Sequence, residues 1–316
     1  MPTTILITGS SGYIGTQLCQ AFQKNPAIQE VIGVDRVPPK NPLSKLTFYQ
    51  RDCTTPLSDI FSAHSIDMVI HLIFFVDMIH DTAQMFLVNV GSLENILRHT
   101  HRFKIQRILI TSSVAAYGAH PDNQIPLRED SPLRGNLDFP YSYDKTIAER
   151  RMALYQKEHP ETELIIARPT IVVGPHLSNY VARFLSRRII PLVKGCTTEM
   201  QFIHESDLTD ALALLTLEGK RGAYNLAPPD SISAEEIAQM QNRWIVRLPG
   251  DLLKRITEWA WRLHLKQITD TPGALIDFFR YPWRVDGSKI TQETSFSYRY
   301  SSRDAVDAFL RGSPMV

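Results

Sequence analysis

The chain has 316 residues, of which 43% are hydrophobic and 21% charged, a balance typical of one large or two coupled globular domains. Its formal net charge of +1 gives no overall positive field, which argues against nucleic acid as a partner. The three cysteines are far apart, which argues against a disulfide framework and a Cys-x-x-Cys metal site, and they predict a reducing, cytoplasmic location.

Short apolar runs alternate with helical patterns through the first half of the chain. Predicted strands cover residues 5–8, 31–34, 47–50, 68–74, 107–111 and 164–168. The intervals carry helical periodicity, for example at residues 13–23, 82–100 and 141–159. Because continuous apolar strands separated by helices form parallel sheets covered on both faces, this order predicts an α/β fold with a doubly wound parallel sheet of the Rossmann type.

After Pro169 the segments become shorter and less regular, which predicts a smaller, mostly helical C-terminal substrate lobe. Two apolar runs, at residues 201–203 and 224–226, resemble strands and suggest that the chain returns to the first domain. The predicted division is a cofactor-binding domain at residues 1–170, with the return at about 198–227, and a substrate-binding lobe at residues 171–197 and 228–316.

The first strand runs directly into a glycine turn at residues 9–15 (GSSGYIG), which opens an amphipathic helix. Glycines permit the tight turn and let the backbone approach a pyrophosphate, while the helix N-terminus supplies N–H donors and a positive dipole. The spacing is G-x-x-G-x-x-G and not the G-x-G-x-x-G of the usual dinucleotide fingerprint. The evidence for a cofactor turn is therefore its position between a strand and a helix. The turn predicts dinucleotide binding.

Asp35 lies at the end of the second strand, twenty residues after Gly15. An acidic residue there accepts hydrogen bonds from the adenosine ribose and repels a 2′-phosphate, which favours NAD over NADP. Arg36 follows immediately and keeps NADP open, since a guanidinium pairs with phosphate.

Tyr141 and Lys145 are spaced i, i+4 at the start of a predicted helix and share one face. A nearby ammonium favours the phenolate and lowers the pKa of the tyrosine, so that Tyr141 can exchange a proton with a substrate oxygen. Ser113 closes the fifth strand and can hydrogen-bond the same oxygen. Tyr143 is two residues from Lys145 and faces elsewhere.

Further motifs accompany these residues in chain order. They are Asp52, VIHL at 69–72, NVGS at 89–92, TSS at 111–113, AYG at 116–118, PYS at 140–142, RP at 168–169, FIH at 202–204 and YNL at 224–226. With them, residues 3–240 resemble the extended short-chain dehydrogenase/reductases, also called the NAD-dependent epimerase/dehydratase family.

The resemblance implies a catalytic trio in which Ser113 polarises the substrate oxygen, Tyr141 is the acid/base and Lys145 tunes it and holds the nicotinamide ribose. It also implies a small-molecule substrate and a homodimer formed through the helices at 82–100 and 141–159. The expected cofactor-binding residues are Gly9, Ser11, Gly12, Tyr13, Ile14, Gly15, Asp35, Arg36, Asp52, Cys53, Leu72, Ile73, Phe74, Asn89, Thr111, Ser112, Tyr141, Lys145, Pro169 and Ile171.

Several departures from the family pattern concern the substrate. The fourth-strand motif continues with bulky residues at 73–75 (IFF), where the family has small ones. Ile171 and Val173 stand where nucleotide-sugar enzymes often have Asn and Tyr, and Met200-Gln201 where they often have an arginine for the diphosphate. The Thr-Asp-Glu signature of the 4,6-dehydratases is absent, since VA follows Ser113. Arginines of the substrate lobe could supply the missing cation: Arg183, Arg187 and Arg188.

The predicted function is therefore NAD-dependent hydride transfer at a hydroxyl-bearing carbon, with a sugar-nucleotide epimerase as one form of it. The alternative is an NAD-dependent dehydrogenase or reductase of an apolar, steroid- or lipid-like alcohol, which the apolar residues at 73–75, 171 and 173 favour. A third reading is a non-catalytic NAD-binding regulator, against which the intact Ser113, Tyr141 and Lys145 argue.

Residues 252–265 (LLKRITEWAWRLHL) alternate apolar and basic residues at helical spacing. This pattern predicts a helix packed on the substrate lobe, with an apolar substrate entrance or a membrane-surface contact as the less favoured reading. The histidines at 64, 71, 80, 99 and 101 show no shared ligand spacing, so no metal is assigned.

Overall fold

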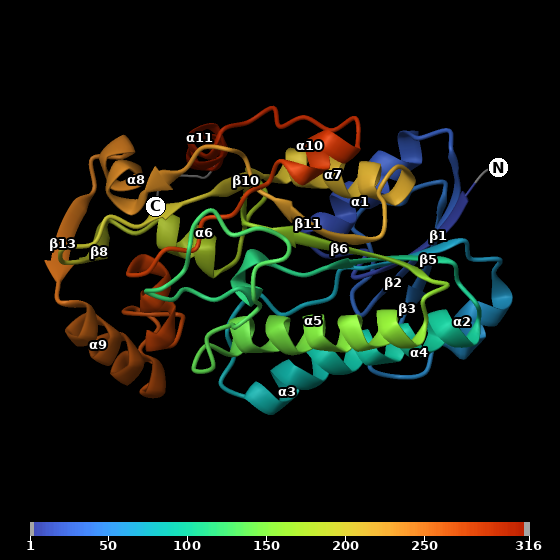
Figure 1. Cartoon of the computed structure of the whole chain (residues 1–316), viewed down its shortest axis with the longest axis horizontal. Helices are drawn as coiled ribbons and strands as arrows, with labels where there is room; N and C mark the ends of the chain where they lie inside the picture. The colour runs from blue at the N-terminus through green and yellow to red at the C-terminus, as the bar shows by residue number, and fades with distance from the viewer. Residues whose placement is uncertain (1–2, 313–316) are drawn as a thin grey trace.

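The computed structural model describes residues 3–312 and centres on a seven-stranded parallel sheet (Figure 1). Its strand order is β11-β6-β5-β4-β1-β2-β3, so the order reverses between β1 and β4. The strands are β1 (Thr3–Thr8), β2 (Ile28–Asp35), β3 (Leu46–Gln50), β4 (Met68–His71), β5 (Arg107–Thr111), β6 (Glu163–Pro169) and β11 (Gly222–Leu226). This confirms the predicted Rossmann-type α/β fold.

Helices cover both faces of the sheet because alternate strand residues point to opposite sides. Ile5 and Ile7 of β1 pack towards α1 (Tyr13–Lys24) and α7 (Glu205–Leu217), whereas Leu6 packs on the other side. That other side carries α2 (Ser58–Ala63), α4 (Ser92–Arg102) and α5 (Pro140–Glu158), and Figure 1 shows α4 and α5 running side by side beneath the sheet.

The predicted helix at 82–100 is three consecutive pieces. It begins as α3 (Thr82–Phe86), continues as a π-helical segment at Leu87–Gly91 and ends as α4. Asn89, inside the π-helical segment, is buried and uses its side chain to bind the loop after β4 and the start of α5. Single π-helical turns inside α-helices occur often at functional sites.

Two predicted strands end or pair differently from expectation. The strand predicted at 68–74 ends at His71, because after Leu72 the chain leaves the sheet edge and Phe75 donates its N–H to the Asn89 side chain instead. The strand predicted at 201–203 is β10 (Phe202–His204), which pairs with β7 (Ile171–Val173) outside the main sheet.

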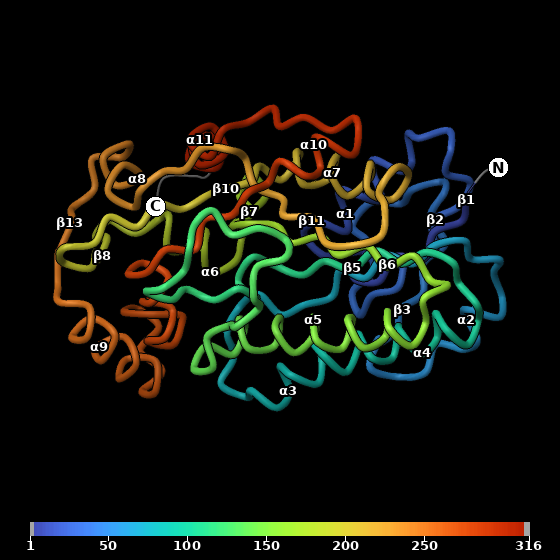
Figure 2. The backbone as a smooth tube through the Cα atoms, viewed as in Figure 1, coloured from blue at the N-terminus to red at the C-terminus, as the bar shows by residue number. Residues whose placement is uncertain are grey.

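The remaining segments form the far end of the molecule, at the left of Figures 1 and 2. They include α6 (Tyr180–Leu185), α8 (Ala234–Met240), α9 (Gly250–Arg262) and a 3-10 segment at Gly273–Phe279. Two small sheets stand beside these helices: β8 (Ile189–Val193) with β13 (Trp244–Leu248), and β9 (Glu199–Met200) with β12 (Ile232–Ser233). The last helices, α10 (Lys289–Glu293) and α11 (Ser302–Gly312), contact β11 and β10.

The exact domain boundaries stay a prediction, and residues 1–2 and 313–316 of the predicted ranges lie outside the described residues. Helix α9 packs on the 3-10 segment. Four apolar residues on its other side are exposed: Leu252, Ile256, Trp259 and Leu263.

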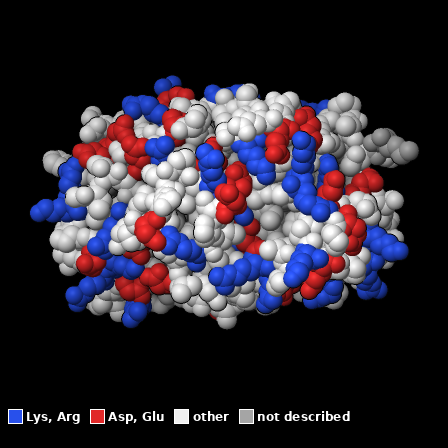
Figure 3. Space-filling model, in the orientation of Figure 1, with Lys and Arg blue, Asp and Glu red and all other residues white. Residues whose placement is uncertain are grey.

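Within residues 3–312, every helix is too short or too polar to cross a bilayer. On the face drawn in Figure 3, acidic and basic side chains are interspersed.

A buried ion pair joins α5 to β6. The guanidinium of Arg168 donates to both carboxylate oxygens of Glu149, at 2.8 and 3.0 Å, and to the Tyr117 hydroxyl at 2.7 Å. The two charged side chains are only 6% and 2% exposed. Removing one partner would leave the other charge buried and uncompensated, which costs more than the pair contributes.

We expect Arg168→Met to lower the free energy of unfolding by about 3–5 kcal/mol, because Glu149 then lies buried without its cation. Urea denaturation followed by circular dichroism measures the loss. The matched control is Arg151→Met on α5, the helix that carries Glu149. The 3.0 Å pair of Arg151 with Glu94 is half exposed and should be worth about 1 kcal/mol or less. Equal urea midpoints for Arg168→Met and Arg151→Met would contradict the stabilising role of the Arg168–Glu149 pair.

Candidate functional site

The glycine turn holds its backbone in contacts that leave no room for larger residues. Gly9 has a φ of +78°, and a Cβ on Gly15 would lie 2.0 Å from the Gly9 carbonyl oxygen. Gly12 caps α1 without a side-chain hydrogen bond, so the first N–H groups of the helix stay available. Within residues 3–312, the Ser11 hydroxyl is also a buried polar group without a partner. These features fit the pyrophosphate of a dinucleotide.

Tyr13 ties this turn to the start of α7. Its hydroxyl donates to the carboxylate of Glu205, which is 3% exposed and also lies 2.5 Å from Nδ1 of His176. Burial, the hydrogen bond and the charge of Glu205 all raise the pKa of Tyr13. Tyr13 therefore stays a neutral donor that anchors the turn.

The end of β2 forms the other side of the expected adenosine site. The Asp35 carboxylate accepts the backbone N–H groups of Ser11, at 3.0 Å, and Val37, at 3.1 Å. Arg36 lies 3.9 Å from Asp52 and is largely exposed. Burial works to raise the pKa of Asp52, but hydrogen bonds from Thr54 and the charge of Arg36 lower it overall. Cys53 is buried beside Asp52.

Two side chains meet in front of the sheet where β5 ends and α5 begins. Ser113 follows β5, and its Oγ accepts the N–H of Ala115 at 3.2 Å. Tyr141 is the second residue of α5, and both it and Ser113 line the same cavity. Burial raises the pKa of Tyr141, and the neighbouring Ser113 hydroxyl only partly offsets this effect. An added positive charge would be needed to favour its phenolate.

Lys145 lies one helical turn further along α5 and is 3% exposed. Its Nζ donates to the Thr111 carbonyl at 3.1 Å, sits 3.4 Å from the centre of the Phe74 ring and 5.8 Å from that of Tyr141. Burial lowers the pKa of Lys145 to about 7, against the charges of Glu149 and Asp144, which raise it. The ammonium is therefore close to its titration point at neutral pH.

Asn89 and His71 fix the groups around Lys145. Asn89 accepts the Phe75 N–H at 2.7 Å and donates to Asp144 at 2.8 Å. The pKa of Asp144 is raised to about 6, mainly by burial. His71 lies 2.7 Å from the Thr8 hydroxyl, and burial together with the charge of Lys145 lowers its pKa to about 3. A neutral His71 adds no second cation beside Lys145.

One cavity of about 550 Å³ extends from the glycine turn past Ser113 and Tyr141 to the C-terminal segments. Most of the predicted cofactor residues line it, and Ser11, Asn89, Thr111, Ser112 and Lys145 do not. The Lys145 ammonium does not face the cavity because it donates a hydrogen bond to the Thr111 carbonyl and lies against the ring of Phe74.

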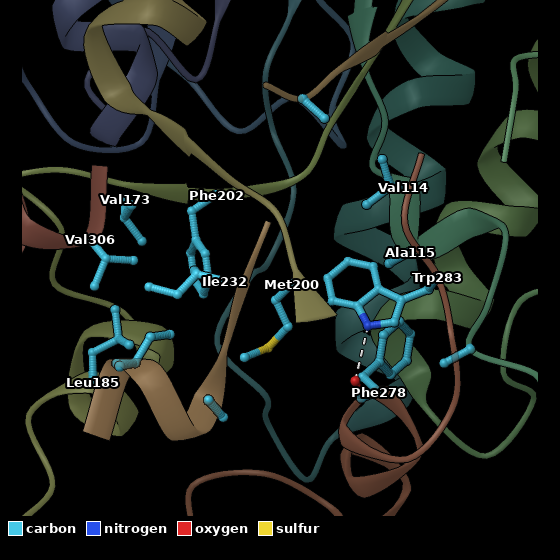
Figure 4. Packing of buried hydrophobic residues seen from close by; sticks show 14 of the residues in the cluster. Val114, Ala115, Val173, Leu185, Met200, Phe202, Ile232, Phe278, Trp283 and Val306 are labelled. Carbon is cyan, nitrogen blue, oxygen red and sulfur yellow. Dashed lines mark hydrogen bonds between the residues drawn. The ribbon is translucent and has the colours of Figure 1, made fainter. Parts of the chain in front are cut away.

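The cavity also has lining residues that the sequence did not indicate. They are mainly aromatic and aliphatic side chains from distant segments: Phe139, Tyr180, Val181, Phe184, Leu185, Phe202, Leu275, Phe278, Phe279 and Trp283. Trp283 and Phe278 lie beside Ala115, close to the end of β5 (Figure 4). The aromatic composition after residue 243 was the only signal in the sequence, and it has no period that assigns it to a pocket.

Away from the cavity, the fold brings together His101, His159 and Glu161. Their possible ligand atoms lie within 4.8 Å of one another, and the two imidazole rings stack at 3.9 Å. Sequence spacing gave no hint of this group, because the residues come from α4 and from the loop after α5. The absence of a metal stays a prediction.

The sequence matches the model of the NAD dependent epimerase/dehydratase family over residues 5–227. An uncharacterised protein of Mycobacterium tuberculosis is 21% identical over 98% of this chain and 84% of its own length. The UDP-glucuronic acid decarboxylase 6 of Arabidopsis thaliana is 27% identical over 74% of this chain and 72% of its own.

Solved structures share the fold over almost the whole chain. A UDP-glucose 4-epimerase from Thermotoga maritima superimposes with a TM-score of 0.76 at 16% identity, covering 98% of this chain and 99% of that one. The enzyme WbmG of Bordetella bronchiseptica, solved in complex with NAD, gives a TM-score of 0.75 at 19% identity, covering 99% and 94%.

We expect Gly15→Ala to weaken NAD⁺ binding by about tenfold or more, the effect of losing about 1.4 kcal/mol. The new Cβ would lie 2.0 Å from the Gly9 carbonyl oxygen, so the turn must open. Isothermal titration calorimetry measures the affinity. Gln20→Ala, at an exposed position of the same helix, is the control and should bind like the wild type. Unchanged affinity in Gly15→Ala would show that the turn does not hold the dinucleotide.

Proposed function

The chain belongs to the NAD-dependent epimerase/dehydratase family, and on this basis we propose that it catalyses hydride transfer at a hydroxyl-bearing carbon, with Tyr141 as the acid/base. The observation that supports the proposal most directly is that Ser113 and Tyr141 line the same cavity as the glycine turn. A substrate oxygen placed between them would lie within reach of a dinucleotide held at that turn.

When bound, NAD⁺ supplies the hydride acceptor for such a reaction. Tyr141 takes the hydroxyl proton of the substrate, and Ser113 donates a hydrogen bond to the same oxygen. The buried ammonium of Lys145, 5.8 Å from the Tyr141 ring, favours the phenolate by its charge. Asn89 and Asp144 keep α5 and the loop after β4 in register, so these residues position the others.

The cofactor preference in this proposal is NAD over NADP. The Asp35 carboxylate is fixed by the N–H groups of Ser11 and Val37 and would face a 2′-phosphate with a negative charge. Arg36 lies 3.9 Å from Asp52, whose negative charge competes with a phosphate for the guanidinium. Titrations with both cofactors compare the two affinities.

A sugar-nucleotide epimerase is the second candidate function. The proteins with similar structures support this candidate, because one of them is a UDP-glucose 4-epimerase. Such an enzyme returns the hydride to the opposite face of the substrate carbon, so that no net oxidation occurs. The third candidate, a non-catalytic NAD-binding regulator, gives no use to Ser113 and Tyr141 in the cavity or to the buried Lys145.

We also propose a homodimer in a reducing, cytoplasmic location. Exposed apolar side chains occur on the helices expected to pair: Phe86, Leu87, Tyr143 and Leu154. The three cysteines are free thiols. Light scattering of the purified chain would give twice the mass of 36.0 kDa if the dimer forms.

We expect Tyr141→Phe to lower the rate of hydride transfer by about 10²–10⁴-fold, because the phenyl ring keeps the packing but has no proton to exchange. NADH formation or consumption is followed at its absorbance band, and isomer formation by chromatography. Tyr143→Phe is the matched control, since Tyr143 lies two residues away and is 38% exposed.

NAD⁺ binding should be preserved in both tyrosine variants. If Tyr141→Phe turns over substrate at the wild-type rate, Tyr141 is not the acid/base of the reaction. Absence of turnover of every candidate substrate by the wild-type protein would support the regulator instead.

A further inference from the structure

The end of the cavity beyond Tyr141 is a continuous aromatic surface. Tyr141 contacts Phe74 and Phe139, with ring centres 5.4 and 6.1 Å apart. Phe139 contacts Phe278 at 5.6 Å, and Phe278 contacts Trp283 at 5.3 Å. The wall of the cavity is therefore hydrocarbon from Tyr141 to Trp283.

Most polar groups of this wall are paired within the protein. Trp283 donates its indole N–H to the Phe278 carbonyl at 2.9 Å (Figure 4). The Thr170 hydroxyl donates to the Gln201 carbonyl at 2.7 Å, and the Asn179 side-chain oxygen accepts the N–H of Val181 at 2.9 Å. The uncharged amide NH2 of Asn179 remains able to donate to a ligand.

Tyr180 adds a second uncharged polar group. It lines the cavity, and among residues 3–312 its hydroxyl has no hydrogen-bond partner. Burial raises the pKa of Tyr180, and the neighbouring Tyr141 and Asp77 raise it further, so the phenol stays neutral. One neutral hydroxyl makes room for one further polar atom on a ligand.

Formal charge occurs only at the opposite end of the cavity. Its charged lining residues are Asp35, Arg36, Arg51 and Asp52, which come from the end of β2 and the segment after β3. All lining residues belong to the described part of the chain. A dinucleotide in the glycine turn would place its adenosine against these four side chains.

The Lys145 ammonium contacts Phe74 but does not line the cavity. Two cations of α6 and α9 are bound to carboxylates. Arg183 pairs with Asp270 at 2.8 Å and with Asp77 at 3.0 Å. Lys254 pairs with Asp277 at 2.6 Å and with Asp138 at 2.9 Å. Neither these residues nor the other arginines of the α6 region, Arg187 and Arg188, line the cavity.

A nucleoside diphosphate does not fit this wall. Each phosphate carries a negative charge that must be matched by cations or by several donors once it leaves water. The aromatic wall offers only the Tyr180 hydroxyl and the Asn179 amide, and no lysine or arginine among residues 3–312 lines it, so the two charges of a diphosphate would be desolvated without a cation to match them. An apolar ring or chain gains from the same burial.

We propose that the substrate is an uncharged alcohol with a bulky apolar body, held by its hydroxyl at Tyr141 and Ser113 and by its hydrocarbon against Phe139, Phe278 and Trp283. This inference rests on the proposed hydride-transfer function and names its substrate class. The carbinol C–H bond breaks with its electron pair passing to NAD⁺, and the O–H proton passes to Tyr141. The products are the ketone, NADH and a proton that Tyr141 releases to water.

The test is a calorimetric titration of the NADH-loaded protein with alcohols of increasing ring size: cyclohexanol, cyclooctanol and cyclododecanol. UDP-glucose is titrated in parallel. We expect affinity to rise with each added methylene, by up to about fourfold, and we expect no heat from UDP-glucose. Phe279→Ala, which truncates a half-buried residue of the wall, should reduce the affinity for cyclododecanol by about tenfold.

Trp259→Ala is the matched control, because Trp259 is 61% exposed on α9. It should bind every alcohol like the wild type, and retention of NADH binding shows that each variant is folded.

Tighter binding of UDP-glucose than of any alcohol overturns the substrate class, as does an affinity that is independent of ring size or a failure of both classes to bind. The proposed function is judged separately, by the Tyr141→Phe comparison with whichever compound is turned over. UDP-glucose turnover that depends on Tyr141 would therefore keep hydride transfer and reject the apolar substrate.

Discussion

The burial of the Lys145 ammonium is the constraint around which the site is arranged. An isolated cation inside a protein costs several kcal/mol, so its surroundings must recover that energy. Here the Thr111 carbonyl and the face of Phe74 do so directly, while Asp144 and Glu149 act through their charges. Because the recovery is incomplete, the pKa falls to about 7. The protonation of Lys145, on which the proposed reaction depends, is therefore sensitive to nearby charges. A bound dinucleotide would change the pKa of Lys145.

Phe74 connects this electrostatic feature to the shape of the cavity. Its ring lies against the Lys145 ammonium and touches Tyr141 edge-on at 5.4 Å. A small side chain at this point could do neither. The chain reaches this position because β4 ends early and Asn89 captures the N–H of Phe75. A single π-helical turn thereby sets the loop after β4 and, through Asp144, the start of α5.

Local patterns predicted the parts of the structure that local sequence determines. The glycine turn, β5 and the start of α5 lie where periodicity and spacing put them. The exact end of β4 and the partner of β10 were missed, because each depends on a tertiary contact. The aromatic wall was missed for a stronger reason. Phe139 and Phe278 are far apart in sequence, and neither has neighbours at a spacing that would indicate a shared pocket.

The cavity changes from a charged lining at its Asp35 end to an apolar lining beyond Tyr141, and this change affects the proposed reaction. Water can solvate the charged end near Asp35 and Arg36, where a dinucleotide would contribute its own polar groups. Beyond Tyr141 the wall is hydrocarbon, so a substrate body that fills it displaces water from Tyr141 and Ser113. Electrostatic interactions strengthen as water leaves a site. An apolar substrate would thus increase the influence of Lys145 on Tyr141, and binding and activation would come from the same contact.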